Sequence, residues 1–177
     1  MSRKLLATIP ALLAPMFGLV LTAHADNNVH IPGTACSPRK SDVGKTQYNT
    51  VRIQNESTSS SATVSCPVHY QDDANHGPTN FFVRVIDRNS ASDVSCTFRI
   101  FDEFSTTVIF QSTVRSSGNT SSVQDLDDGS GNGIELDPFA GFSLMSMDCS
   151  LPLDPDGSHR SSVVNYQLGQ VCTGVCP

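Results

Sequence analysis

The stretch "ATVSCPVHY", residues 62–70, decides the fold class of this chain. Every second residue, from Ala62 through to Tyr70, is apolar, and most of the residues between them are polar. Because successive side chains of a strand point to opposite faces of a sheet, this alternation predicts a β-strand with one buried face.

The same period of two recurs along most of the chain. It is clear in "TNFFVRVID" (79–87) and "DVSCTFRI" (93–100), and weaker in "QYNTVRIQ" (47–54), "TTVIFQSTV" (106–114), "FSLMSMDCSL" (142–151) and "SVVNYQLGQV" (162–171). Clusters of turn-forming residues separate these segments. No long segment of the chain keeps the hydrophobic period of an α-helix. Short strands at this spacing predict an all-β, antiparallel β-sandwich or jelly-roll-like fold, with a closed barrel as the alternative.

The first 25 residues have the pattern of a secretory signal peptide. Arg3 and Lys4 precede an apolar run over residues 5–23, and Ala23-His24-Ala25 forms a small-x-small cleavage signal. An uncleaved membrane anchor is the alternative, because the run is nearly long enough to span a bilayer. No second run of comparable length follows, so we expect no membrane insertion after cleavage and a secreted or periplasmic protein.

The remaining 26–177 segment has the length of one ordinary domain, which we expect to be a single β-sandwich. The whole chain carries a formal charge of −6, from 11 basic and 17 acidic residues. Removing Arg3 and Lys4 leaves 9 basic residues and a charge of −8. The charge is spread out and no basic stripe exists, which argues against nucleic acid and anionic membrane surfaces as partners.

All six cysteines lie after the predicted cleavage site. An even number in an oxidising compartment predicts three disulfides rather than a metal site, since no Cys-x-x-Cys pair occurs. Six cysteines allow fifteen pairings, which spacing alone does not resolve. Among them we expect Cys36–Cys66, Cys96–Cys149 and Cys172–Cys176, with the two longer loops each stabilising the fold by about 4 kcal/mol.

The contexts of the cysteines occur in one order along the chain: "IPGTAC" (31–36), "CP" (66–67), "VIDR" (85–88), "VSC" (94–96) and "CSLP" (149–152). A strand carrying Tyr166 ends the series. The sequence thereby resembles a set of uncharacterised, exported bacterial proteins with a Pro-Gly-x-x-Cys start and four core cysteines. The resemblance implies export and a β-sandwich, and no activity, ligand or catalytic residue. This chain departs from the pattern in having no Trp and an additional pair, Cys172 and Cys176.

A glycine-rich acidic stretch, "DLDDGSGNGIELD" (125–137), is a calcium candidate. Asp128, Ser130 and Asn132 stand at loop positions one, three and five, with a glycine at six. Phe139 occupies the twelfth position, where a bidentate glutamate is needed, and Glu135 and Asp137 are out of register. We therefore favour a polar connection between two strands, with calcium as the alternative.

Enzymatic motifs are absent from the sequence: it has no His-Glu-x-x-His and no Gly-x-Ser-x-Gly. A triad could assemble in space, for example from His69 or His76 with Asp72 or Asp73 and a distant serine. For the stretch "QDDANHGP" (71–78), however, we favour a hydrated turn. A paired-carboxylate glycosidase is possible, although only three glutamates are present.

The sequence thus predicts an exported, non-enzymatic β-sandwich that acts as a binding, adhesive or envelope-associated module. The alternative is a secreted hydrolase with a loop-assembled site. A histidine within reach of both a carboxylate and a serine in a concave pocket would favour the hydrolase. Carbohydrate binding through flat aromatic platforms is poorly supported, because the chain has no Trp and only three Tyr.

Overall fold

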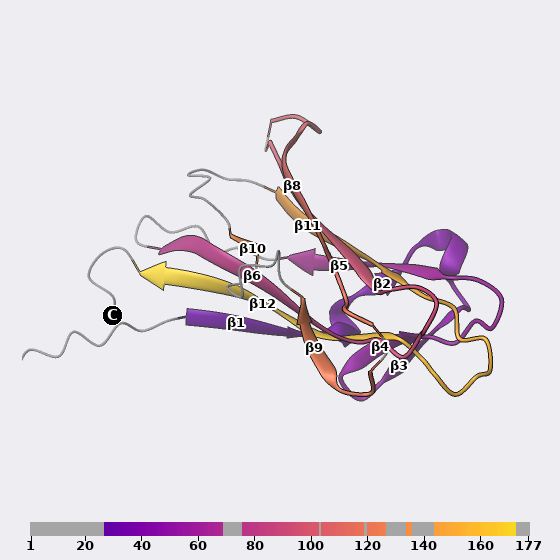
Figure 1. Ribbon diagram of the computed structural model, residues 1–177. Coiled ribbons are helices and arrows are strands. Elements are labelled where there is room, and N and C mark those ends of the chain that lie inside the picture. Colours follow the sequence, from indigo (N-terminus) through magenta and orange to yellow (C-terminus); the bar gives the residue numbers. More distant parts are fainter. Residues whose placement is uncertain are drawn as a thin grey trace, which may run out of the picture.

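The computed structural model describes residues 27–68, 76–102, 104–118, 120–126, 134–135 and 144–172. Two antiparallel sheets lie face to face and form a β-sandwich, which confirms the predicted fold class (Figure 1). The seven-stranded sheet contains β1 (Asn27–Pro32), β3 (Thr46–Asn49), β4 (Arg52–Asn55), β6 (His76–Ile86), β9 (Val123–Leu126), β10 (Ile134–Glu135) and β12 (Ser162–Cys172). The five-stranded sheet contains β2 (Ser37–Pro38), β5 (Ala62–Val68), β7 (Ser95–Phe101), β8 (Val108–Arg115) and β11 (Leu144–Leu151).

The order of strands brings distant parts of the chain together. In the seven-stranded sheet the order is β10-β6-β12-β4-β3, with β1 also paired to β12 and β9 to β6. The five-stranded sheet has the order β2-β5-β11-β7-β8. Two short 3₁₀ helices, η1 (Gly33–Ala35) and η2 (Lys40–Asp42), follow β1 and β2. In the described residues, no helix is long and apolar enough to cross a membrane.

The core confirms the inward faces expected from the alternation. In β5 every second residue from Ala62 to Val68 is buried, and the residues between them are exposed or half-buried. The inward residues of β6 and β7 meet between the sheets, where the Phe81 and Phe98 ring centroids lie 4.6 Å apart. Stacked aromatic pairs of this kind add to the free energy gained from burial alone.

Tyr166 joins the two sheets by a polar contact inside the core. Its ring is fully buried in β12, and its hydroxyl donates a 2.6 Å hydrogen bond to the Pro67 carbonyl oxygen in β5. Burial raises the pKa of the Tyr166 hydroxyl to about 12, because a phenolate would be desolvated there.

Two of the three expected disulfides, Cys36–Cys66 and Cys96–Cys149, are present in the structure. Cys96–Cys149 joins paired positions of β7 and β11, whereas Cys36, at the end of η1 and directly before β2, is bonded to Cys66 of β5. The Cα atoms are 4.0 Å apart in each disulfide, and all four cysteines are buried. The third expected pair, Cys172–Cys176, lies outside the described residues because Cys176 and the Cys172 side chain are not described.

Gly33, in the "IPGTAC" stretch, lies where two backbones approach closely. A Cβ atom at this position would be 2.1 Å from the carbonyl oxygen of Val163 and 2.8 Å from its carbonyl carbon. Only glycine fits such a contact without displacing the backbone of β12. The glycine of the motif is thus explained by the packing of η1 on β12.

The segment "QYNTVRIQ", expected as one strand, is a β-hairpin. β3 and β4 pair in a register that places Asn49 opposite Arg52, so Thr50 and Val51 form the turn. The Asn49 side chain accepts a 2.8 Å hydrogen bond from the Thr50 backbone N–H, which favours the turn over a continuous strand. The expectation of a single strand was wrong because the local Asn-Thr chemistry outweighs the alternation.

Both ends of the calcium candidate stretch belong to strands. β9 ends at Leu126 opposite Val83, and β10 begins at Ile134 opposite Phe81, so the chain leaves and rejoins the same edge of β6. The connection between them lies outside the described residues, so the polar turn favoured above stays a prediction. Four of the proposed ligands, Asp128, Ser130, Asn132 and Asp137, lie outside the described residues, as does the Glu135 side chain.

A candidate binding site at one end of the sandwich

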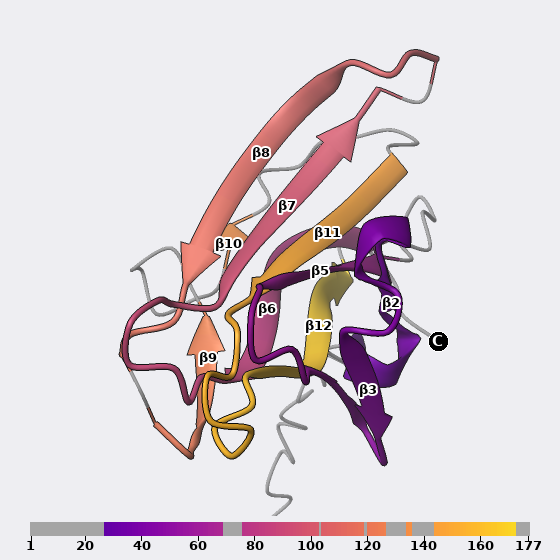
Figure 2. The same ribbon diagram turned by 90° about the vertical axis from the view of Figure 1, so that its right-hand side faces the viewer.

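The candidate site lies at the end of the sandwich where residues 152–161 connect β11 to β12. In Figure 2 this connection and the β7–β8 turn lie at opposite ends of the five-stranded sheet. Two other segments reach the same end: residues 87–92, which follow β6, and the β3–β4 hairpin. The site is therefore built from three segments that are far apart in the sequence.

Asp87 fixes the first of these segments. Its carboxylate is fully buried and accepts hydrogen bonds from the backbone N–H groups of Asn89 and Val94, at 3.0 and 3.1 Å. The hydroxyls of Ser116 and Ser161 also donate to it. Four donors from the ends of different strands thus converge on one buried carboxylate, and this network positions the neighbouring Arg88.

Asn55 fixes the start of the connection between β11 and β12. The Asn55 side chain is fully buried, and its Nδ2 donates to the carbonyl oxygens of Leu151 and Pro152 at 3.1 and 2.8 Å. Two residues later, the Asp154 backbone N–H donates a 2.8 Å hydrogen bond to the carbonyl of Ser57. The connection is therefore held on the β4 side by side-chain and backbone contacts.

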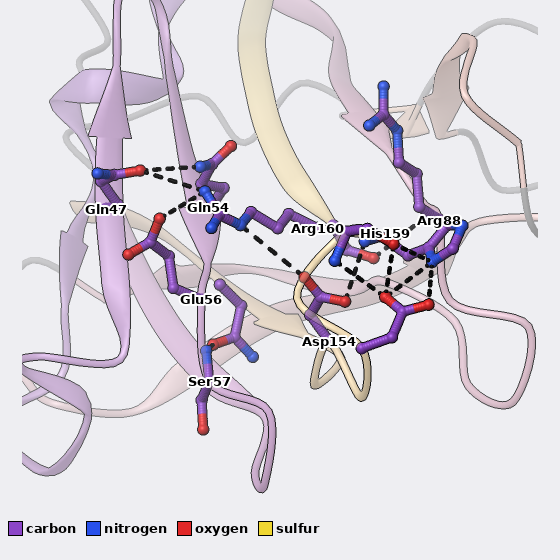
Figure 3. A network of polar contacts seen from close by, with 12 residues as sticks. Gln47, Gln54, Glu56, Ser57, Arg88, Asp154, His159 and Arg160 are labelled. Carbon is purple, nitrogen blue, oxygen red and sulfur yellow. Dashed lines mark hydrogen bonds and ion pairs between the residues drawn. The ribbon is translucent and has the colours of Figure 1, made fainter.

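Arg160 lies between two acidic residues at the centre of this end (Figure 3). Its guanidinium group is 2.6 Å from a Glu56 oxygen and 3.8 Å from Asp154 Oδ2. Asp154 is fully buried, and its other oxygen accepts a 3.0 Å hydrogen bond from the His159 backbone N–H. The charge of Arg160 is therefore matched by carboxylates of the protein itself.

The tip of the connection folds on itself around Asp156. The Asp156 carboxylate accepts hydrogen bonds from the Ser158 backbone N–H at 2.9 Å and from the Ser158 hydroxyl at 2.8 Å. These two bonds, followed by the contact with His159, hold the pKa of Asp156 well below its usual range. Asp156 is thus an ionised carboxylate at neutral pH, exposed at the surface of the site.

A hollow of about 270 Å³ opens beside this network, and we call it the arginine hollow. It is lined chiefly by Arg52, Arg88 and Arg160 together with Asn49, Gln54 and Ser158. Among the described residues, neither Arg52 nor Arg88 has an ion-pair partner, and the buried Nε of Arg88 has no hydrogen-bond acceptor. In Figure 3 the Arg88 side chain extends away from Asp154. Two unmatched guanidinium groups therefore face one small hollow.

His159 does not form a catalytic triad, although it satisfies the distance criterion for one. Its Nδ1 atom lies 2.7 Å from Asp156 Oδ2 and 3.0 Å from the Ser158 hydroxyl. A triad requires the carboxylate at one ring nitrogen and the serine at the other, so that the ring can pass a proton between them. Here both groups contact the same nitrogen, which leaves the serine without a general base.

Asp154 and Asp156 also do not fit a paired-carboxylate mechanism. A general acid of this type needs a raised pKa, whereas the pKa of Asp156 is lowered by Ser158. Asp154 is fully buried beside Arg160 and cannot reach a substrate without rearrangement. The geometry of the described residues therefore gives no support to the hydrolase alternative at this end.

Asp154, Asp156 and His159 have potential metal-ligating atoms that lie within 4.8 Å of one another. Each of these groups already has a partner in the protein: Ser158 and His159 bind Asp156, and Arg160 faces Asp154. A cation would have to compete with the Arg160 charge and displace the Ser158 bonds. We therefore interpret this cluster as a set of contacts that stabilise the conformation of the connection, rather than as a metal centre.

The residues proposed for a triad in the sequence analysis lie outside the described part of the chain. These are His69, Asp72 and Asp73, together with the side chain of His76. The described site instead uses arginines that the sequence analysis did not single out. The available signals were weak: Arg88 closes the "VIDR" stretch and Arg160 follows "DPDGSH" (154–159), both interpreted only as strand ends or turns.

No family model and no curated protein matches the sequence. Among solved structures, the chain is similar to "Truncated AlyQ with CBM32 and alginate lyase domains", at 11% sequence identity and a TM-score of 0.32. The similarity covers 83% of this chain and 34% of that one, so this chain spans about a third of the length of that protein. The similarity identifies neither a ligand nor an activity for this chain.

Proposed function

We propose that the protein is an exported, non-enzymatic binding module whose site is the arginine hollow and whose ligand carries an anionic group. The two buried disulfides support export, because disulfides persist in oxidising compartments. The signal-peptide pattern of residues 1–25 points the same way. The binding role rests on the site at the end of the sandwich.

The observation that carries the proposal is the state of Arg88. Its Nε is buried, and among the described residues it has neither a hydrogen-bond acceptor nor an acidic partner. A buried donor without an acceptor costs about 1–3 kcal/mol, and more when it is charged. The Nε itself is closed to solvent, so a ligand in the hollow would contact the terminal nitrogens of the guanidinium group. An anionic group bound there and at Arg52 would balance two unmatched charges, and planar guanidinium groups bind carboxylates and phosphates through paired hydrogen bonds.

The surroundings favour a specific site over general attraction of polyanions. The chain as a whole has a charge of −6, so anions are repelled from most of its surface. The neutral donors Asn49, Gln54 and Ser158 line the same hollow and can hydrogen-bond the uncharged part of a ligand. The site therefore selects a small anion-bearing molecule with polar groups.

The experiment is a titration of the isotope-labelled protein with glucuronate, inorganic phosphate and sulfate, followed by NMR chemical shifts. We expect saturable shifts at the arginine hollow for at least one anion, with a dissociation constant of about 1 mM or lower. Arg88→Gln should weaken binding at least tenfold, or about 1.4 kcal/mol.

Arg84→Gln is the matched control, because Arg84 is already paired with Asp125 at 2.7 Å and lies outside the hollow. This variant should bind as the wild type does. Absence of saturable binding for all three anions, or an equal loss in Arg84→Gln, would overturn the proposal.

A further inference from the structure

Two further hollows adjoin the arginine hollow and share residues with it. The first, the hydroxyl hollow of about 430 Å³, is lined by Arg88, Thr120, Ser121, Ser158 and His159. The second, the acidic hollow of about 360 Å³, is lined chiefly by Arg88, Ala91, Leu153, Pro155, Asp156 and His159. Arg88 borders all three hollows.

The shared residues define a path. Arg88 and Ser158 separate the arginine hollow from the hydroxyl hollow, and Arg88 and His159 separate the hydroxyl hollow from the acidic one. Each hollow is at or near the small end of the range of ligand pockets, so each suits one small chemical unit. Three adjoining hollows therefore suit an extended ligand built from linked units.

The chemistry changes along this path. Arg88 borders both ends of the path, so the difference lies in the other residues. The arginine hollow adds the unmatched charge of Arg52, whereas the acidic hollow adds the ionised carboxylate of Asp156. A second anionic unit would be repelled by Asp156, but a unit with hydroxyl groups could donate hydrogen bonds to that carboxylate. Leu153 and Pro155 add apolar surface that suits the C–H face of such a unit.

We propose that the ligand is an acidic oligosaccharide in which a charged sugar occupies the arginine hollow and a neutral sugar occupies the acidic hollow, an inference that rests on the function proposed above. Hydroxyls of Thr120 and Ser121 are placed to hydrogen-bond the chain between these two sugars. Recognition is chiefly through charge and hydrogen bonds, because no Phe, Tyr or Trp is among the described residues that line the hollows. The same feature disfavours nucleotides, whose bases are usually bound by aromatic stacking.

The test compares glucuronate with short oligosaccharides that carry one terminal glucuronic acid followed by one or two neutral sugars. We expect at least one of these to bind about tenfold more tightly than glucuronate, which corresponds to about 1.4 kcal/mol. A chain of uronic acids of the same length should show no such gain, since its further carboxylates meet Asp156. A neutral oligosaccharide should bind more weakly than all of these.

A variant with a filled hollow separates this inference from the proposed function. Ala91 is exposed and borders the acidic hollow, so Ala91→Leu, which fills space without adding an aromatic ring, should remove the gain from neutral sugars and leave glucuronate binding unchanged. Thr106→Leu, an exposed change in the β7–β8 turn outside all three hollows, is the control and should keep the gain.

The outcomes are distinct for the two proposals. If glucuronate binds but neither longer sugar binds more tightly, the oligosaccharide is refuted and the anion site stands. If an aspartate-rich peptide binds more tightly than every sugar, the ligand is a peptide and the inference is again wrong. If no anion binds at all, the proposed function itself fails.

Discussion

Replacing Asp87 by asparagine tests whether the buried carboxylate organises the site end of the sandwich. Oδ1 accepts from the Asn89 backbone and Ser161, and Oδ2 accepts from the Val94 backbone and Ser116. An amide has nearly the same shape but only one acceptor oxygen, so its nitrogen must face one of the two backbone N–H groups. The serine hydroxyls can rotate to adapt, whereas a backbone donor cannot.

The cost follows from these contacts. The amide nitrogen is best tolerated at the Oδ2 position, because the Val94 N–H also donates a 2.9 Å hydrogen bond to the Ser116 hydroxyl and keeps that acceptor. The main cost is then the lost strength of a charged acceptor in the remaining bonds, about 1–2 kcal/mol. Relief of the carboxylate desolvation offsets part of this loss. We expect Asp87→Asn to lower the free energy of unfolding by about 1–2 kcal/mol, equivalent to a fall of about 2–8 °C in Tm for a chain of this size.

Urea denaturation of the oxidised protein, followed by far-ultraviolet circular dichroism, measures the change. Asp93→Asn is the matched control, because Asp93 is exposed in the same segment and its substitution should change stability by no more than about 0.5 kcal/mol. If the midpoints of the two variants coincide, the carboxylate does not hold this end together and the reasoning is refuted.

Three further predictions concern the core, the tyrosine and the acidic stretch. Gly33→Ala should lower the urea midpoint by the equivalent of about 1–3 kcal/mol, because its methyl group meets the Val163 carbonyl; an unchanged midpoint would contradict the close contact. Since the pKa of Tyr166 is raised from 10.0 to about 12, its contribution to stability should be complete below pH 10 and lost as pH rises to about 12. Tyr166→Phe should flatten that part of the stability profile, and an unchanged slope would count against the burial argument. Millimolar calcium should leave the melting curve unmoved, and a rise in Tm that Asp128→Asn abolishes would show that the stretch is a calcium loop after all.

The core could be predicted from the sequence because burial of one sheet face imposes a period of two. The inward cysteines, Val64 and Phe98 all follow that period, and all are buried. The short strands β9 and β10 were not predicted, since their four and two residues are too few to show a period. Their conformation depends instead on the edge of β6 that they pair with.

The site could not be predicted in the same way because its residues share no local pattern. Arg52 belongs to a hairpin, Arg88 follows a strand, and Arg160 ends a connection that the sequence indicated only as a turn. Their convergence depends on the pairing of β12 with both β4 and β6, which brings these three segments to one end. A residue's lack of an ionic partner is likewise a property of tertiary structure.

The position of β12 also sets an order on folding. β12 is the last strand among the described residues, yet it lies inside the seven-stranded sheet and pairs with β1, β4 and β6. Every strand of the five-stranded sheet, and both disulfides that the structure describes, precede it. During synthesis from the N-terminus, the five-stranded sheet can therefore form, and its disulfides can be oxidised, while β1 still lacks its partner strand β12. Such long-range pairing is slow, and until β12 arrives the apolar faces of the waiting strands are open to aggregation or to capture by a chaperone.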